Sequence, residues 1–195
     1  KLRLRDVLLL VLLISFFACT YPAEAVSAKI SDKKGKAYSI PADFSGVVIA
    51  HAPASRGIYL GSPALAVLPD GAYIAKCDEF GPRSQRLTNP ISRIFRSDDA
   101  GNTWRQISRI KGMWWANFFM HRGVLYAMGT NKVYGAVIIR KSTGGGKTWT
   151  QPTDKTSGVL RDDGKYHTAP VPVVEHNGRL WRAMEDAQGP GGWGS

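Results

Sequence analysis

Two histidines of this 195-residue chain stand beside strand-like runs, where an imidazole can move a proton. His51 follows the apolar run 46–50, and His167 lies between Tyr166 and a proline-rich apolar run. An imidazole at the end of a strand can act as general acid or base. We therefore expect His51 and His167 to be catalytic and Tyr166 to bind substrate. The simpler interpretation is that both histidines are hydrogen-bonded structural residues.

Two pairs of adjacent carboxylates occur in the chain, and each pair follows a strand-like run. Asp78 is followed by Glu79, and Glu185 by Asp186, each time after a run of aliphatic and aromatic residues. Two carboxylates can share the acid and base roles of glycoside hydrolysis, and carboxylates also bind sugar hydroxyls or Ca²⁺. We expect Asp78 to be catalytic and Glu185 to bind substrate, with Ca²⁺ a candidate ligand but no metal site or cofactor established. The alternative is that these residues are solvated loop charges.

Two arginines are candidates for binding an acidic substrate. A guanidinium holds a carboxylate through two parallel hydrogen bonds, which suits a uronate. We expect Arg56 and Arg182 to bind substrate, whereas Arg140 directly precedes a turn motif and fits a strand edge better. Trp114 and Trp115 can stack on sugars, but their alternation with later phenylalanines favours core packing.

These residues must be positioned by a repeated β unit. The pattern Ser-x-x-x-Gly-x-Thr-Trp spans 97–104 and returns at 142–149, and a β-type run precedes each copy. In such a turn Ser or Asp binds backbone amides, Gly adopts a positive φ, and Trp packs between neighbouring units. We expect structural roles for the following members of the two turns: Ser97, Asp99, Gly101, Thr103, Trp104, Ser142, Gly146, Thr148 and Trp149.

A second repeat has the pattern of a β-hairpin. Three turns end in Gly71, Gly123 and Gly178, at intervals of 52 and 55 residues, and each is flanked by strand-like runs. Together with the Trp-containing turn, this gives about four strands in each 45–55 residues, which is the size of one propeller blade. No stretch has the periodicity of an amphipathic helix. The sequence therefore predicts an all-β fold built from blades.

The Trp-containing turn resembles the Asp-box, or BNR repeat, of sialidase-like β-propellers. The first copy matches at every position, and the second has Gly144 in place of the Asp. The resemblance covers residues 45–195 and implies a six- or seven-bladed β-propeller of the sialidase type, with only about the first three blades present. Asp-boxes occur in propellers of unrelated activity, so they imply a fold and not a substrate.

The resemblance breaks down at a position that sialidases use for chemistry. Their Arg-Ile-Pro motif supplies an arginine that binds the sialic acid carboxylate, and the matching stretch here is Gly61-Ser62-Pro63. Other stretches, among them 49–55 and 166–172, resemble exported bacterial sialidase-like proteins of the α-L-rhamnosidase and rhamnosyl-glucuronate lyase type. That resemblance implies that a histidine is central to the chemistry.

The N-terminal segment has the features of an export signal. Basic residues are followed by the apolar run 7–18 and then by small residues, which is the pattern of a secretory signal peptide. The expected organisation is a signal peptide at 1–25, a lead-in segment at 26–44 and a partial propeller at 45–195. The alternative is a lipoprotein signal that ends before Cys19, with a lipid anchor at Cys19. We expect a secreted or periplasmic protein, or a cell-surface lipoprotein, with no transmembrane span in the mature chain.

The chain is strongly basic, with 26 Lys and Arg against 15 Asp and Glu and a net charge of +11. For an exported protein this balance favours an acidic polysaccharide or glycoconjugate as partner, and not nucleic acid. The alternative is that the excess charge is spread over the surface and serves solubility.

Three functions follow, in this order of preference. The first is an exported carbohydrate-active enzyme, a glycoside hydrolase or polysaccharide lyase, that acts on acidic glycans containing uronate or sialate. The second is a non-catalytic glycan-binding propeller, which the missing arginine at Gly61 favours. The third is a true exo-α-sialidase.

Overall fold

The computed structural model describes residues 29–31, 37–39, 46–168 and 171–187. The predicted signal peptide, with Cys19, lies outside the described residues. Within the lead-in segment, β1 (Lys29–Ser31) and β2 (Ala37–Ser39) pair as a small antiparallel ladder. No helix in the described ranges is long and apolar enough to cross a membrane.

The first large sheet is a four-stranded antiparallel meander, in which each strand pairs with the next one along the chain. A short 3-10 turn, η1 (Ala54–Arg56), precedes it. Burial alternates along the strands because successive side chains point to opposite faces of a sheet. The strands are β3 (Tyr59–Val67), β4 (Tyr73–Phe80), β5 (Ile91–Ser97) and β6 (Arg105–Lys111).

The second large sheet repeats this meander and then departs from it. Its first four strands pair in chain order, and the short β13 adds to the outer edge of β10. A separate hairpin, β11 with β12, stands between β10 and β13 in the sequence. The strands are β7 (Trp114–His121), β8 (Val124–Thr130), β9 (Gly135–Ser142), β10 (Val159–His167), β11 (Val174–His176), β12 (Arg179–Trp181) and β13 (Glu185–Asp186).

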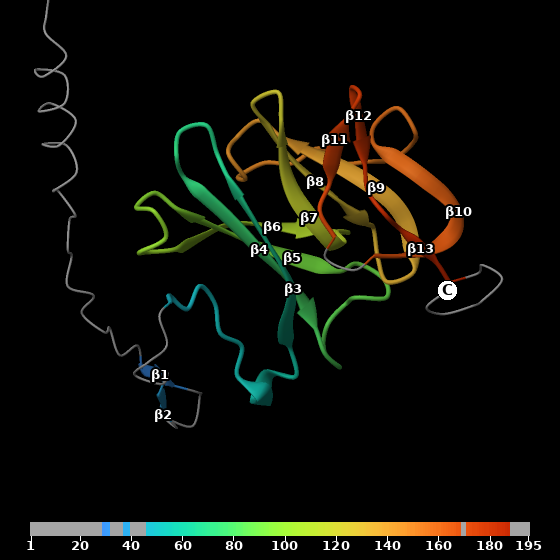
Figure 1. Cartoon of the computed structure of the whole chain (residues 1–195). Coiled ribbons are helices and arrows are strands. Elements are labelled where there is room, and N and C mark those ends of the chain that lie inside the picture. Colours follow the sequence, from blue (N-terminus) through green and yellow to red (C-terminus); the bar gives the residue numbers. More distant parts are fainter. Residues whose placement is uncertain (1–28, 32–36, 40–45, 169–170, 188–195) are drawn as a thin grey trace, which may run out of the picture.

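The core lies between the two meanders, which pack face to face (Figure 1). Ile74 and Ile94 of the first sheet and Leu125 and Ala127 of the second are fully buried in one apolar cluster. The first strands of the two sheets, β3 and β7, contact each other. Removing this apolar surface from water, at about 25 cal/mol per Å², is what holds the sheets together.

Two successive four-stranded meanders stacked in this way are two blades of a β-propeller, and the predicted all-β fold is confirmed. The β11–β12 hairpin continues the series on the far face of the second blade. There Asn117 Nδ2 donates to the carbonyl of Val171, and His121 Nδ1 lies 3.0 Å from Glu175 Oε2. The described part of the chain is therefore a partial propeller.

The repeated turn joins the third and fourth strands of each blade. In the first copy, the amide of Gly101 donates to Ser97 Oγ at 2.8 Å, and both Thr103 N–H and Thr103 Oγ1 donate to the Asp99 carboxylate. Trp104 Nε1 donates to the Gly101 carbonyl at 2.9 Å. Gly101 has φ +91°, a backbone conformation that residues other than glycine rarely adopt.

The second copy keeps this geometry without its acid. The amide of Gly146 donates to Ser142 Oγ at 3.0 Å, and Trp149 Nε1 donates to the Gly146 carbonyl at 2.9 Å. A Cβ at Gly144 would lie 2.8 Å from Thr148 Oγ1, so the threonine hydroxyl fills the space of the missing side chain. Trp149 stacks on Phe118 of the same blade, with ring centroids 5.4 Å apart.

The Trp-containing turns and the candidate site residues lie at opposite ends of the blades. Because the strands are antiparallel, the β3–β4 and β5–β6 turns lie at one end of the first blade, and the β4–β5 loop lies at the other. Both Trp-containing turns are therefore at the first end. The last residues of β4 and β10, which include Asp78 and His167, are at the opposite end.

Candidate functional site

The site is built around a bulge at the start of β7. The pairing of β7 with β8 shifts register between Trp114 and Asn117, and Trp115 adopts φ +50°. A bulky residue in this region is strained by about 1–3 kcal/mol, so the surrounding contacts must hold it there. Its N–H donates to Asp78 Oδ2 at 2.9 Å, and its carbonyl accepts from Arg182 Nη2 at 2.9 Å.

Asp78 is a fully buried carboxylate with internal partners. Lys76 Nζ donates to its Oδ1 at 2.8 Å, and Ser92 Oγ donates to the same atom at 2.6 Å. Burial raises the pKa of Asp78, and the ammonium of Lys76 opposes that shift. Burial likewise lowers the pKa of Lys76, and the carboxylate of Asp78 opposes it. These contacts favour a structural role, so the catalytic role expected for Asp78 stays a prediction.

His167 is paired with the second predicted carboxylate. Its Nδ1 lies 2.8 Å from Glu185 Oε2, and its side chain is 18% exposed. The imidazole meets the indole of Trp115 edge-on, with centroids 4.1 Å apart, and the ring of Tyr134 is 6.4 Å away. A carboxylate that accepts from Nδ1–H fixes the tautomer whose Nε2 carries the lone pair, and this nitrogen can then accept a proton.

Arg182 spans the interior of the site. Its guanidinium donates to the carbonyls of Trp115 and Met128 and lies 3.4 Å from Thr168 Oγ1. Burial lowers the pKa of Arg182 to about 10. Among the described residues no carboxylate forms an ion pair with it. The predicted substrate-binding arginine is thus placed where it holds the bulged backbone.

The structure brings four of the predicted residues together around Trp115 and places three elsewhere. The four are Asp78, His167, Arg182 and Glu185. The hydroxyl of Tyr166 donates to Asp163 Oδ1 at 2.6 Å, and Tyr166 lines a separate pocket to which Arg182 also contributes. His51 and Arg56 are exposed residues of the segment before β3, and Arg56 lines a different pocket. The roles predicted for these seven residues stay predictions.

Position 61 is closed to any side chain. Gly61 pairs with Asp78 across β3 and β4, and a Cβ on Gly61 would lie 2.9 Å from the ring of Phe80. Phe80 is itself packed on Trp114, with ring centroids 4.3 Å apart. A side chain at this position would therefore have to displace an aromatic ring that is packed on Trp114.

Sequence reasoning preferred a core role for Trp115 over sugar stacking, and it missed Lys76 as part of the site. Trp114 is buried as expected for the core, but the bulge turns Trp115 away from it toward His167. No pattern of side chains reveals a bulge in advance. Lys76 did leave a signal, since a charged residue within the run Tyr73–Phe80 of β4 must be paired if that strand is buried.

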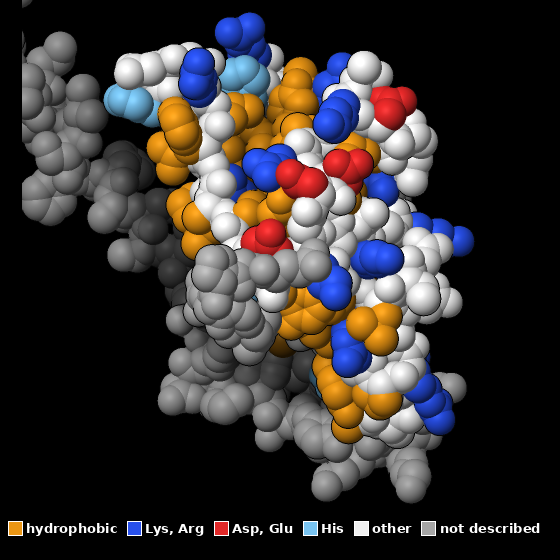
Figure 2. Space-filling view, turned by 90° about the vertical axis from the view of Figure 1, so that its right-hand side faces the viewer, with side chains coloured by type: hydrophobic (Ala, Val, Ile, Leu, Met, Phe, Trp, Pro, Cys, Tyr) orange, Lys and Arg blue, Asp and Glu red, His pale blue; other side chains and the backbone are white. Residues whose placement is uncertain are grey.

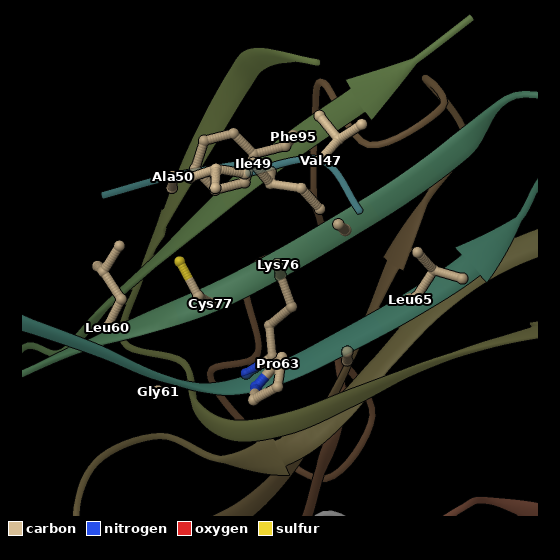
Figure 3. Close-up of a pocket in the computed structure, with 13 residues that line it drawn as sticks. Val47, Ile49, Ala50, Leu60, Gly61, Pro63, Leu65, Lys76, Cys77 and Phe95 are labelled. Atoms are coloured by element: carbon tan, nitrogen blue, oxygen red, sulfur yellow. The ribbon is translucent and has the colours of Figure 1, made fainter. Parts of the chain in front are cut away.

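The described residues do not form a metal centre, since no three of their His, Cys, Asp or Glu side chains lie close enough together to hold an ion. The predicted Ca²⁺ ligand therefore stays a prediction. An apolar cavity of about 510 Å³ lies on the other face of the first blade, where segment 47–50 crosses the sheet. Cys77 and Phe95 project toward that segment, whereas the Lys76 side chain extends away from it (Figure 3). The cavity thus lacks the convergent polar groups of a sugar site.

Basic side chains are dispersed on the face of the molecule seen in Figure 2, among apolar, uncharged and a few acidic ones. They do not form a continuous stripe on that face.

Comparison with known proteins gives likeness in structure only. No protein-family model matches the chain, and no curated protein matches it in sequence. The sialidase of Trypanosoma rangeli is 18% identical over 79% of this chain and 26% of its own, with a TM-score of 0.38. The Fusarium graminearum α-L-arabinofuranosidase Arb93A is 19% identical over 54% and 34%, with a TM-score of 0.43. The Penicillium chrysogenum α-L-arabinanase is 21% identical over 45% and 29%, with a TM-score of 0.36.

The chain is thus similar to sialidase-like β-propeller structures and spans about a quarter to a third of their length. At this level of identity the likeness concerns the fold alone. The assignment to a partial propeller rests on the two stacked meanders and their repeated turns.

Proposed function

We propose that the chain is part of an exported carbohydrate-active enzyme that acts on acidic, uronate-containing glycans. The observation that carries the proposal is the pairing of His167 with Glu185 beside the strained Trp115. A carboxylate-oriented imidazole against an aromatic ring combines a proton carrier with a surface for a sugar. The structures to which the chain is similar include an arabinanase and a sialidase with carbohydrate ligands, which agrees with this class.

Two reactions fit the same imidazole. In elimination, His167 takes the proton from C5 of a uronate, the C–H electron pair forms the C4–C5 double bond, and the bond from C4 to the glycosidic oxygen breaks. The leaving oxygen takes up a proton. A cation near the carboxylate stabilises the enolate-like charge that develops, and Arg182 is the candidate because it shares Trp115 with His167. In hydrolysis, His167 takes a proton from the attacking water, whose oxygen bonds to C1 as the bond from C1 to the glycosidic oxygen breaks. The leaving oxygen takes up a proton from solvent.

The test is activity on two classes of glycan. The full-length protein should act on rhamnose–glucuronate glycans, seen as new reducing ends or as absorbance of an unsaturated uronate. His167→Ala should lower kcat about 100-fold or more with a small change in KM, because general acid–base catalysis contributes roughly 10²–10⁴-fold. Glu185→Gln should lower kcat less, because it keeps an acceptor for the imidazole.

The matched control is His176→Ala, which changes an exposed histidine at the end of β11. It should retain full activity. Release of sialic acid from sialyl conjugates, with no action on uronate glycans, would contradict the proposal.

The second candidate is a non-catalytic glycan-binding propeller. Two observations favour it. Phe80 fills the space beside Gly61, and the Asp78 carboxylate accepts hydrogen bonds from groups inside the protein. Both positions lack the exposed side chains of sialidase chemistry. A binding protein would hold the uronate glycan as tightly in His167→Ala as in the wild type, and neither protein would turn it over.

Export and organisation belong to the same proposal. A signal peptide at 1–25, a lead-in at 26–44 and a propeller beginning at 45 agree with an enzyme that meets polysaccharide outside the cell. Cys19 remains the proposed site of a lipid anchor in the alternative signal. Expression of the full-length protein with radiolabelled palmitate distinguishes the two, because only a lipoprotein takes up the label.

A further inference from the structure

The bulge at Trp115 is held on both of its peptide groups by side chains of opposite charge. The N–H of Trp115 donates to Asp78 Oδ2 at 2.9 Å, and its carbonyl accepts from Arg182 Nη2 at 2.9 Å. Asp78 belongs to the first blade and Trp115 to the second, whereas Arg182 directly follows β12. The backbone of one residue is thus held by two segments that lie 37 and 67 residues away in the chain.

The Asp78 carboxylate divides its two oxygens between the blades. Its Oδ1 accepts from Lys76 Nζ at 2.8 Å and from Ser92 Oγ at 2.6 Å, so neighbours within the first blade fix its orientation. Its Oδ2 accepts from the Trp115 N–H of the second blade. A hydrogen bond to an ionised acceptor is roughly twice as strong as one between neutral groups. The first blade therefore presents a strong acceptor, in a fixed place, to the bulge.

The neighbouring strand β8 supports the bulge from another side. A Cβ on Gly129 would lie 2.5 Å from the carbonyl oxygen of Trp114 and 2.7 Å from the Cα of Ala116, so the β8 backbone passes directly against the bulged residues. Trp115 has φ +50°, a region in which a bulky residue is strained. Such a conformation persists only where the surrounding contacts hold it. The acceptor on Asp78 is one of these contacts.

The position of Trp115 decides how the imidazole of His167 is held. Glu185 Oε2 lies 2.8 Å from His167 Nδ1 and fixes one nitrogen of the ring. The indole of Trp115 meets the imidazole edge-on, with centroids 4.1 Å apart, and this contact restrains the tilt of the ring. A change in the backbone at Trp115 would move the indole and remove the second of these restraints.

We propose that Asp78 is a positioning residue, which acts on His167 through Trp115 and does not itself touch the substrate. Its effect on turnover rests on the proposed function, whereas its effect on the contact between Trp115 and His167 does not. A buried ion pair can often be replaced by apolar residues without loss of stability. Stability alone therefore does not require Asp78 and Lys76, but the strained position of Trp115 requires an acceptor at this point.

The experiment compares two double variants of the full-length protein, Lys76→Met/Asp78→Asn and Lys76→Met/Asp78→Leu. Both remove the buried charges, and Asn and Leu have similar branched shapes, but only Asn keeps an oxygen that can accept from the Trp115 N–H. NMR of the imidazole C–H groups measures the ring-current shift that the indole causes, and His167→Ala identifies the signal. The asparagine variant should keep the wild-type shifts of His167, and the leucine variant should lose them.

Turnover of the rhamnose–glucuronate glycan is the second measurement. The leucine variant should have a kcat about ten-fold or more below that of the asparagine variant, with little change in KM, because a misplacement of about 1 Å can cost about 10²-fold in rate. If the leucine variant does not fold, Lys76→Met/Asp78→Ala also removes the acceptor and takes its place with the same expectations.

Equal imidazole shifts in the two variants would overturn the proposal, and so would equal values of kcat. A wild type that turns over no glycan would overturn the proposed function, and the imidazole shifts would then decide the role of Asp78 by themselves. The failure of one proposal is thus told apart from the failure of the other.

Discussion

Two carboxylates of this protein have the same chemistry but different environments. Asp78 and Glu185 are both carboxylates at strand ends, yet Asp78 is sealed against Lys76 and Ser92, whereas Glu185 is 43% exposed and paired with His167. Burial decides between the roles, because an enclosed charge must be satisfied internally and an accessible one can serve a substrate. The spacing of acids in the sequence marks both positions equally and does not distinguish them.

The Asp78–Lys76 pair gives a prediction about stability. Asp78→Asn removes the negative charge and leaves the buried Lys76 ammonium unpaired, so we expect a loss of about 3–5 kcal/mol in the free energy of unfolding. Adding Lys76→Met should recover much of the loss, since the double variant has no buried charge. Urea denaturation followed by tryptophan fluorescence measures both. A single Asp78→Asn variant as stable as the wild type would show that the pair is not coupled in this way.

The strands and turns follow from the spacing of motifs in the sequence, whereas the arrangement of the site does not. Two copies of one turn and three hairpin glycines place the strands of the first two blades close to where the structure has them. The β7 bulge and the attachment of β13 to β10 depend on contacts between distant segments, such as Arg182 on the carbonyl of Trp115. Local pattern therefore predicts the blades, while the arrangement around Trp115 needs the tertiary fold.

The repeated turn gives a pH prediction. Hydrogen bonds from the Thr103 hydroxyl and amide lower the pKa of Asp99 to about 2, from an ordinary value of 3.8. A lowered pKa means that Asp99 stabilises the fold above about pH 4, and that this contribution is lost as the pH falls toward about 2. Asp99→Gly copies the second turn, which lacks the acid. The Tm of this variant should be lower than the Tm of the wild type near neutral pH, and the two Tm values should converge in acid.

Thermal unfolding scans across this range give the measurement. Asp162→Gly, which changes a carboxylate whose side chain is exposed in β10, controls for the loss of a negative charge. A gap in Tm that persists unchanged into acid would contradict the role given to Asp99.

The junction between the two blades relies on a buried cation. Arg140 of β9 is 3% exposed and donates to the carbonyls of Lys111 and Gly112, which link the first blade to the second. It also donates to Thr150 and Gln151 after the second turn. Burial lowers the pKa of Arg140 to about 10. One planar group thereby joins the end of one sheet to a loop of the next.

Arg140→Met is expected to lower the free energy of unfolding of both stacked blades. It leaves several oxygens at the junction without a donor, and the loss should be about 3–5 kcal/mol in the free energy of unfolding. Arg140→Lys should lose nearly as much, because an ammonium cannot reach the same set of acceptors. Guanidinium denaturation monitored by circular dichroism measures the change. If Arg140→Met matched the wild type, the junction would be held by apolar packing alone.

The bulge at Trp115 has a counterpart that bears on how the chain avoids misfolding. β3 is also bulged, between Gly61 and Ala64, and Ser62 has φ +47°. Neighbouring repeats of similar sequence risk pairing strands with the wrong hairpin during folding. A bulge fixes which residues can face each other, so a strand shifted along its partner would carry the defect to a place that cannot hold it. The bulges in β3 and β7 thus fix the register of each strand against its own hairpin partner.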